Sequence, residues 1–383
     1  MSGDVKKILS DLGSVSRGRS RHRPRNDESL YGGLYPFFQT GDVKAANLYL
    51  SEYSQTYNEK GLAQSKLWDE GTLCITIAAN IAETAILDKK GCFPDSIVGF
   101  VSNPEKSDVR FVKYYIDTIK IGMQNISKGT TQDNLSVDKL LSFEFKVPPL
   151  PEQKRIAGIL SAYDDLIENN LRRIKILEEM AQSLYREWFV HFRFPGHEST
   201  PMIDSPLGPI PEGWEVATVN ELLKRFPAGK KYNQKSALKE GVVPILDQGK
   251  SGIIGHHNDQ PGVEATEDDP LIVFANHTCY QRIIQYPFSA IQNVLPFRSS
   301  DDKPRNIYWL HWATKDLIEF NDYKGHWPEF IAKTLILPPD KICGSFGVHA
   351  EAVIRSIYKL ERRNQNLRTT RDLLLPKLLT PPV

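Results

Sequence analysis

Residues 152–189 read EQKRIAGILSAYDDLIENNLRRIKILEEMAQSLYREWF, and a mainly apolar set of residues recurs at every third or fourth position along this stretch. In steps that alternate between four and three residues, the repeating positions are Ile156, Leu160, Tyr163, Ile167, Asn170, Ile174, Leu177, Ala181, Leu184 and Trp188. This spacing is the heptad seam of a helix that packs against another helix. At 1.5 Å per residue, a helix of about 36 residues is roughly 54 Å long, far more than a small core requires. The stretch therefore predicts a spacer helix.

The C-terminal segment carries the same seam in the same phase. Its repeating positions are Val353, Ile357, Leu360, Asn364, Leu367, Arg371, Leu374 and Leu378. The two helices are therefore predicted to be partners. Asn170 and Asn364 interrupt the two seams at different heptads, and two interpretations are open. A buried Asn fixes the register of a helix pair, whereas an Asn on a frayed seam faces solvent.

Self-similarity extends to the segments before each helix. YPFFQTGDV (35–43) corresponds to VPILDQGKS (243–251), with Pro36 matching Pro244 and Gly41 matching Gly249. GTLCITIAAN (71–80) corresponds to DPLIVFANHT (269–278), KGTTQDN (128–134) to KGHWPEF (324–330), and FKVPPLPEQ (145–153) to LILPPDKIC (335–343). The chain therefore reads as a tandem duplication of about 190 residues. We expect a first domain at 1–148, a helix at 149–192, a linker and second domain at 193–341, and a second helix at 342–383.

Composition narrows the class of protein. The 383 residues are 40% hydrophobic and 25% charged, with a net charge of +1, so any surface for nucleic acid must be a local patch. The four cysteines show no spacing typical of a zinc module or a disulfide framework. No signal peptide is visible, and no apolar run approaches the roughly 18 residues of a membrane span. We expect a cytoplasmic protein without a membrane partner.

Motifs of catalytic sites are missing from the sequence. It contains no nucleotide-binding loop, no nucleophile elbow and no tetrapeptide of the kind that amino-methyltransferases use on a flipped base. Asp95, Glu144 and Lys146 imitate the pattern of metal-dependent nucleases, but their spacing is long and the strings arise often by chance. His277 and Cys279 lack further ligands nearby, which favours an ordinary loop. We therefore expect no catalytic residue and no metal site.

Recognition chemistry is more evident. SRGRSRHRPR (16–25) places arginines at every second position, so an extended chain would present one row of guanidinium groups to phosphates. The alternative is a disordered basic arm. Amides and hydroxyls near turns could read bases, although such residues often simply make turns. The candidate DNA-binding residues are Arg17, Arg19, Arg21, Arg23, Gln39, Thr40, Lys128, Thr130, Thr131 and Gln132 in the first copy, and Lys230, Lys231, Gln248, Lys250 and Lys324 in the second.

The sequence resembles the specificity subunits of Type I restriction-modification enzymes. The resemblance rests on KVPPLPEQKRIAGIL (146–160), PIPEGWE (209–215) and LERRNQNLRTTRDLLLPKLL (360–379), and it covers essentially the whole chain. It implies an α+β fold in which two globular α/β target recognition domains, a pseudo-twofold tandem repeat, are joined by two long antiparallel helices. Each domain would read one half of a bipartite, asymmetric site in double-stranded DNA, and the helices would set the spacing.

The resemblance also implies partners. Two methyltransferase subunits, which hold S-adenosylmethionine, would dock on the helices, and two translocating endonuclease subunits would complete the complex. This chain would then direct catalysis without performing it and would bind no cofactor. One departure is that the second copy lacks counterparts of Glu152 and Gln153. Two other functions stay open, a coiled-coil adaptor that binds no DNA and a recognition subunit that serves a different catalytic partner.

Overall fold

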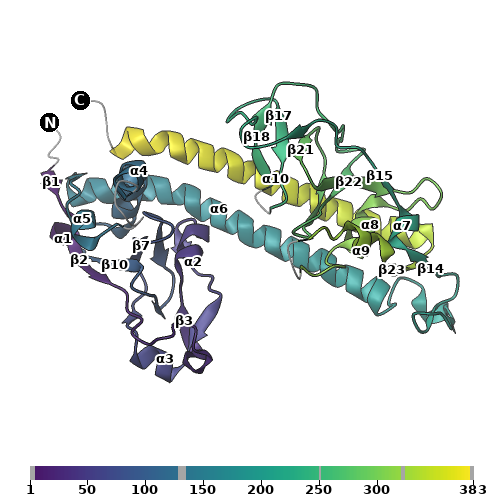
Figure 1. The fold of residues 1–383 in the computed structure, drawn as a ribbon, viewed down its shortest axis with the longest axis horizontal. Helices are drawn as coiled ribbons and strands as arrows, with labels where there is room; N and C mark the ends of the chain where they lie inside the picture. The colour runs from purple at the N-terminus through teal and green to yellow at the C-terminus, as the bar shows by residue number, and fades with distance from the viewer. Residues whose placement is uncertain (1–4, 128–134, 250–251, 321–323, 380–383) are drawn as a thin grey trace. The chain divides into compact units, whose positions relative to one another are not determined.

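The protein folds as two units, described here from a computed structural model that covers residues 5–127, 135–249, 252–320 and 324–379 (Figure 1). Unit 1 comprises Met1–Arg173 and Leu360–Val383, and unit 2 comprises Ile174–Lys359. Each unit combines β-sheets with short helices and includes a segment of both long helices. The predicted α+β fold with two long helices is confirmed.

Helix α6 spans Leu150–Tyr185 and helix α10 spans Asp340–Leu379, with lengths of 36 and 40 residues. Both follow a Pro-Pro pair, and they begin in the same way. The carbonyl of Pro149 accepts the first helical N–H groups of α6, and the carbonyl of Pro339 accepts those of α10. A proline just outside a helix suits this position because its fixed φ is already close to helical. After α6 the chain makes one π-helical turn, Arg186–Val190.

The predicted seam lies inside both units. Every seam residue is buried or half-buried: Ile156, Leu160, Tyr163, Ile167, Ile174, Leu177, Leu184, Trp188, Val353, Ile357, Leu360, Leu367, Leu374 and Leu378. Within unit 1, Asn170 Nδ2 donates to Asn364 Oδ1 over 2.8 Å, and both side chains are buried. The interpretation that these Asn residues are buried is therefore correct, and that of a frayed seam facing solvent is wrong. Within unit 2, Trp188 packs edge-on against Phe346, so the two helices are antiparallel in each unit.

Unit 1 contains two main sheets. The five-stranded sheet has the order β2-β10-β7-β8-β4, the four-stranded sheet has the order β5-β3-β9-β6, and β1 pairs with β11. The strands are β1 Val5–Lys7, β2 Gly13–Arg17, β3 Tyr31–Phe37, β4 Tyr49–Leu50, β5 Gln55–Tyr57, β6 Leu67–Trp68, β7 Leu73–Thr76, β8 Thr84–Leu87, β9 Gly91–Cys92, β10 Ile97–Ser102 and β11 Phe145–Val147. The helices are α1 Leu9–Leu12, α2 Thr40–Ala45, α3 Glu59–Ala63, α4 Val109–Ser127 and α5 Val137–Leu141.

Unit 2 has a corresponding set of sheets. One has the order β15-β22-β19-β20, another has the order β16-β21-β17-β18, and β14 pairs with β23. The strands are β12 Met202–Ile203, β13 Ile210–Pro211, β14 Glu215–Thr218, β15 Leu223–Arg225, β16 Lys231–Tyr232, β17 Val243–Leu246, β18 Ile253–His257, β19 Leu271–Ala275, β20 Gln281–Ile284, β21 Ser289–Ile291, β22 Val294–Ser299 and β23 Thr334–Leu337. The helices are α7 Val219–Leu222, α8 Ile307–Thr314 and α9 Trp327–Ala332.

The two units repeat the same topology. Strands β2-β10-β7-β8 correspond in order and direction to β15-β22-β19-β20. Strand β3 pairs in parallel with β9, as β17 does with β21. The β1–β11 pair, which leads into α6, corresponds to the β14–β23 pair, which leads into α10. The tandem repeat inferred from short strings of sequence is therefore a repeat of whole domains.

The Pro- and Gly-rich segment that begins at Arg193 is an ordered connection in unit 2. It forms the short β12–β13 hairpin, and Phe194 and Trp214 are buried. The Trp214 ring packs against the rings of Phe189 and Phe194. Aromatic burial therefore fixes a segment whose composition by itself predicts only a linker.

Candidate nucleic-acid interface

The arginine-rich segment of unit 1 is held against the sheet. Gly18 N–H donates to Ile97 O at 2.8 Å and Arg19 N–H donates to Phe93 O at 3.0 Å, while Gly18 and Ser20 are buried. The arginines alternate with these buried positions and are exposed. The segment is thus an ordered chain with exposed arginines at every second position, called here the arginine row, although it bends from residue 23; the alternative of a disordered arm is wrong.

The arginines of this row have different surroundings. Arg19 Nε donates to Ser65 O at 2.8 Å, and Arg23 Nη1 donates to the carbonyls of Ser20 and His22. Arg25 forms an ion pair of 2.7 Å with Asp95. Within the described ranges, no hydrogen bond or ion pair engages the side chains of Arg17 and Arg21. These two guanidinium groups are therefore the ones available to an external anion.

Lys66 adds a cation that sequence reasoning missed. Its Nζ donates to Ser16 Oγ at 3.3 Å and lies 3.4 Å from the centre of the Trp68 ring. Burial and the nearby Arg19 lower the pKa of Lys66. Nothing in the sequence around Lys66 indicates this position, because hydrogen bonds between distant segments, from Arg19 Nε to Ser65 O and from Arg21 N–H to Gln64 Oε1, bring it beside the arginines.

The other unit 1 candidates lie at the start of α2. Gln39 is exposed, and its Nε2 donates to Gln55 Oε1 at 2.7 Å, while Thr40 begins the helix. Lys44 on the same helix donates to Asn80 Oδ1 at 3.2 Å, which links α2 to the loop between β7 and β8. Lys128, Thr130, Thr131 and Gln132 lie outside the described residues.

In unit 2, strand register identifies the counterpart of the arginine row. Val15 of β2 faces Phe100 of β10, and Arg225 of β15 faces the corresponding Phe297 of β22. Arg21 lies six residues after Val15, and Lys231 lies six residues after Arg225, so each follows the paired edge strand of its unit. Lys231 is exposed, and its pKa is lowered by partial burial and by Arg225.

Lys230 is engaged within unit 2. It forms an ion pair of 2.8 Å with Asp259, and its Nζ lies 4.9 Å from the centre of the Tyr232 ring. The Asp259 carboxylate raises the pKa of Lys230. Of the two predicted lysines, Lys231 therefore has the freer side chain.

Three loops of unit 2 come together around Gln248. Gln248 Oε1 accepts the His277 N–H at 2.9 Å, and Thr278 Oγ1 donates to Gln248 O. The His277 ring lies 2.8 Å from Lys324 O through Nδ1. The Gln248 amide thus holds the loop after β19. Lys250 lies outside the described residues.

The nuclease-like residues do not form a site. Asp95 faces Arg25, and Glu144 forms an ion pair of 2.7 Å with Lys6. Over the described ranges, no three side chains of His, Cys, Asp or Glu gather as metal ligands would, and this holds for His277 and Cys279 too.

A buried polar cluster attaches the C-terminal helix to unit 1. Tyr114 on α4 donates its hydroxyl proton to Asp164 on α6, and Arg371 on α10 forms an ion pair with the same carboxylate. The Asp164 side chain is 0% exposed and that of Arg371 is 17% exposed. Burial and the Asp164 carboxylate raise the pKa of Tyr114. In the sequence, Arg371 stands out because it occupies a position on an apolar seam. Nothing in the sequence identifies Asp164 as its partner.

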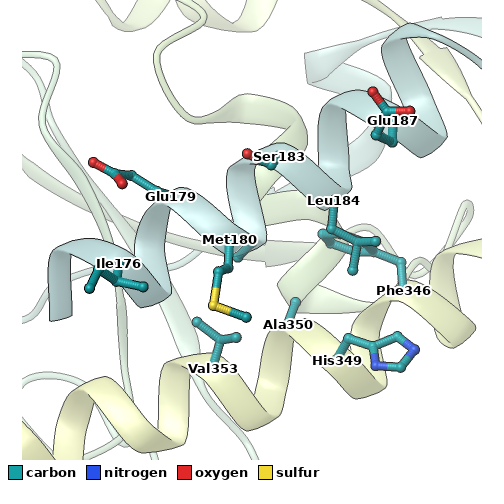
Figure 2. A pocket seen from close by; sticks show the side chains of 11 residues that line it. Ile176, Glu179, Met180, Ser183, Leu184, Glu187, Phe346, His349, Ala350 and Val353 are labelled. Carbon is teal, nitrogen blue, oxygen red and sulfur yellow. The ribbon is translucent and has the colours of Figure 1, made fainter. Parts of the chain in front are cut away.

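Unit 2 also has an apolar groove between its segments of α6 and α10. The groove has a volume of about 630 Å³, and Figure 2 shows Met180 pointing toward Val353 across it. Its lining residues include Ile176, Met180, Leu184, Phe346 and Val353, with Glu179 and Glu187 contributed by the first helix. Ile176 and Met180 are more than half exposed. This surface offers apolar area flanked by negative charge.

Comparison with known proteins agrees with this architecture. Residues 3–179 match the family model described as a Type I restriction modification DNA specificity domain. The specificity subunit of the Type I restriction enzyme MjaIX from Methanocaldococcus jannaschii is 25% identical, over 98% of this chain and 92% of its own length. The chain is a Type I restriction-modification specificity subunit. A putative MjaX specificity subunit of the same organism is 30% identical over 42% of this chain and 36% of its own length.

The fold of a known specificity subunit also matches. The crystal structure of the S subunit of a Type I restriction-modification system from M. genitalium aligns with 100% of this chain and 97% of that one, with a TM-score of 0.60 and 16% identity. In the part of this specificity subunit that the structure describes, no helix is long and apolar enough to cross a membrane.

The specificity subunit compensates for the residues missing from its second copy. In unit 1 the buried Gln153 donates to Pro148 O at 2.9 Å and so joins the start of α6 to its neighbours. The corresponding residue in unit 2 is the buried Cys343. The equivalent carbonyl, Pro338 O, accepts from Cys343 Sγ at 3.7 Å and also from Arg305 Nε at 3.1 Å. The two helix starts are thus kept in place by different residues.

Proposed function

We propose that each unit of this specificity subunit reads one half of a bipartite DNA site and that helices α6 and α10 set the separation of the two halves. The observation that carries this proposal is the repeated sheet, with an exposed cation on the segment that follows the matching edge strand in each copy, Arg21 after β2 and Lys231 after β15. Cations at matched positions suit the phosphates of two half-sites.

The two half-sites differ in this proposal. The loops after the matched strands carry different chemistry, Gln39 and Thr40 at the start of α2 in unit 1 and Gln248 with His277 in unit 2. Because base edges are read by amides, hydroxyls and imidazoles in defined positions, different loops select different bases. An asymmetric recognition site follows.

Methyltransferase subunits are the partners that this proposal requires. Two copies of the methyltransferase subunit bind along the long helices and carry S-adenosylmethionine. Translocating endonuclease subunits join the larger complex. The open apolar groove between Met180 and Val353 supports a protein contact at these helices, because an exposed apolar surface of this kind marks an interaction site. This chain supplies recognition, and its partners supply the chemistry.

Salt-dependent DNA binding by the reconstituted complex tests the proposal. Arg17→Ala combined with Arg21→Ala should weaken binding to every sequence, and the slope of log K against log salt should flatten by about two, since each phosphate contact contributes about 0.9. Base preference should not change. Arg25→Ala is the matched control, because Arg25 already faces Asp95.

An unchanged salt slope in the double variant would remove the arginine row from the interface. A wild-type complex that shows no sequence-specific binding would instead contradict DNA recognition as a whole and favour the protein-binding adaptor.

A further inference from the structure

Each unit displays one apolar side chain that is almost fully exposed. Leu34 is 91% exposed and Val242 is 84% exposed. Leu34 lies in β3, two residues before Pro36, and Val242 immediately precedes β17, two residues before the matching Pro244. Single exposed apolar residues are common on protein surfaces. The same exposure at the same place in both copies calls for a shared explanation.

A glycine that approaches the neighbouring strand closely precedes the exposed residue in both units. A Cβ on Gly33 would lie 2.3 Å from Asn58 Cα, at the end of β5, and a Cβ on Gly241 would lie 2.9 Å from His256 Cβ, on β18. Strands β5 and β18 are the matching antiparallel neighbours of β3 and β17. Leu34 lies in a bulge of β3, between Tyr31 and Tyr35, which both pair with Tyr57, and Val242 lies at a bend just before β17, so neither side chain is covered by the neighbouring strand.

The strands that carry or follow these two residues are linked to the cationic segments. In unit 1 the hydroxyl of Tyr31, at the start of β3, donates to Arg25 O at 2.7 Å. In unit 2 Val243 faces His257, whose ring stacks on Tyr232 at 4.2 Å between centroids. Tyr232 directly follows Lys231. In each copy, the strand at the apolar tip is therefore linked to the segment that carries the cations.

We propose that Leu34 and Val242 are base-contacting residues, one for each half-site, which insert between or against the bases while the neighbouring cations bind phosphates. Apolar side chains do not bind phosphates. They do pack against thymine methyl groups and between unstacked base pairs. The insertion thereby adds a sequence-dependent contribution to the binding of each unit. This inference rests on the proposed DNA recognition.

Leu34→Ala and Val242→Ala in the complex with the methyltransferase subunit test this role, with binding measured on the mapped target and on unrelated DNA. Each variant should bind the target on the order of tenfold more weakly, as expected for the loss of a few buried methyl or methylene groups. Binding to unrelated DNA and the salt slope should stay the same, since no charge is altered. Leu207→Ala is the control, because Leu207 is 45% exposed but lies in the turn between β12 and β13.

The two variants should also relax base preference in different half-sites. Target binding equal to wild type in both variants would overturn the inference while leaving DNA recognition intact. Loss of methyltransferase assembly with unchanged DNA affinity would overturn it too, by identifying a protein-docking surface. Failure of the wild-type complex to select any sequence would refute the proposed function itself.

Discussion

Arg371→Met should destabilise unit 1 far more than a typical surface arginine substitution. The change removes the only cation that contacts Asp164 among the described side chains, and that carboxylate is 0% exposed. Removing one partner of a buried ion pair costs about 3 to 5 kcal/mol, because the remaining charge is left desolvated. Asp164 keeps the hydrogen bond from Tyr114, and Arg371 itself is 17% exposed, so we expect about 3 kcal/mol, the lower limit.

Differential scanning calorimetry measures this effect. For a unit of roughly 150 to 250 residues, 1 kcal/mol shifts the melting temperature by about 2 to 4 °C, so the unit 1 transition should fall by roughly 6 to 12 °C. Arg355→Met is the matched control on the same helix. Its ion pairs with Glu351, Glu267 and Asp268 are exposed, and such pairs contribute less than about 1 kcal/mol.

A second variant distinguishes a buried charge from lost packing. Asp164→Leu combined with Arg371→Leu removes both charges, and replacement of a buried ion pair by apolar residues is often neutral. The combined variant should therefore melt well above Arg371→Met. Equal melting temperatures for Arg371→Met and Arg355→Met would refute the reasoning.

Two further predictions concern unit 2. Burial lowers the pKa of His311 to about 3, so only the unfolded chain, with a pKa near 6.5, takes up this proton between pH 6.5 and 3. The stabilisation from neutral His311 is complete above pH 6.5 and is lost as the pH falls. Urea unfolding should therefore show that the free energy of unfolding falls by about 2 kcal/mol between pH 7 and pH 5. This loss should be absent in His311→Gln. If both proteins lose the same stability, His311 is not the group responsible. Lys231→Ala should flatten the salt slope of DNA binding by about one, whereas Lys230→Ala should change it less, because Lys230 is paired with Asp259. A larger change in the salt slope for Lys230→Ala than for Lys231→Ala would indicate that Lys230 is the residue that contacts the phosphates.

Local periodicity was sufficient to predict the long helices. Positions such as Ile167 and Ile357 repeat with the helical period, and burial of a seam follows directly from that pattern. The duplication was visible for a similar reason, because strands with the same partners keep similar apolar patterns. The pairing of Asn170 with Asn364 needed the structure, since either residue by itself is equally compatible with solvent.

The candidate interface was predicted less completely, because contacts between distant segments decide which polar groups are free. Arg19 and Arg17 look equivalent in the sequence, yet Arg19 bonds to Ser65 O. Gln248 likewise holds a loop through His277. The exposure of Leu34 depends on how closely Gly33 approaches the end of β5, which no pattern in the sequence reveals.

Mapping of methyladenine tests the central claim most directly. The chain would be co-expressed with its methyltransferase subunit in a host free of DNA methylation, and the genome read by single-molecule sequencing. Two units with matched sheets and different loops predict one motif, made of two short, unequal half-sites separated by a fixed gap. Methylation at a single undivided motif, or its absence while the two proteins are both soluble and unassociated, would contradict the account.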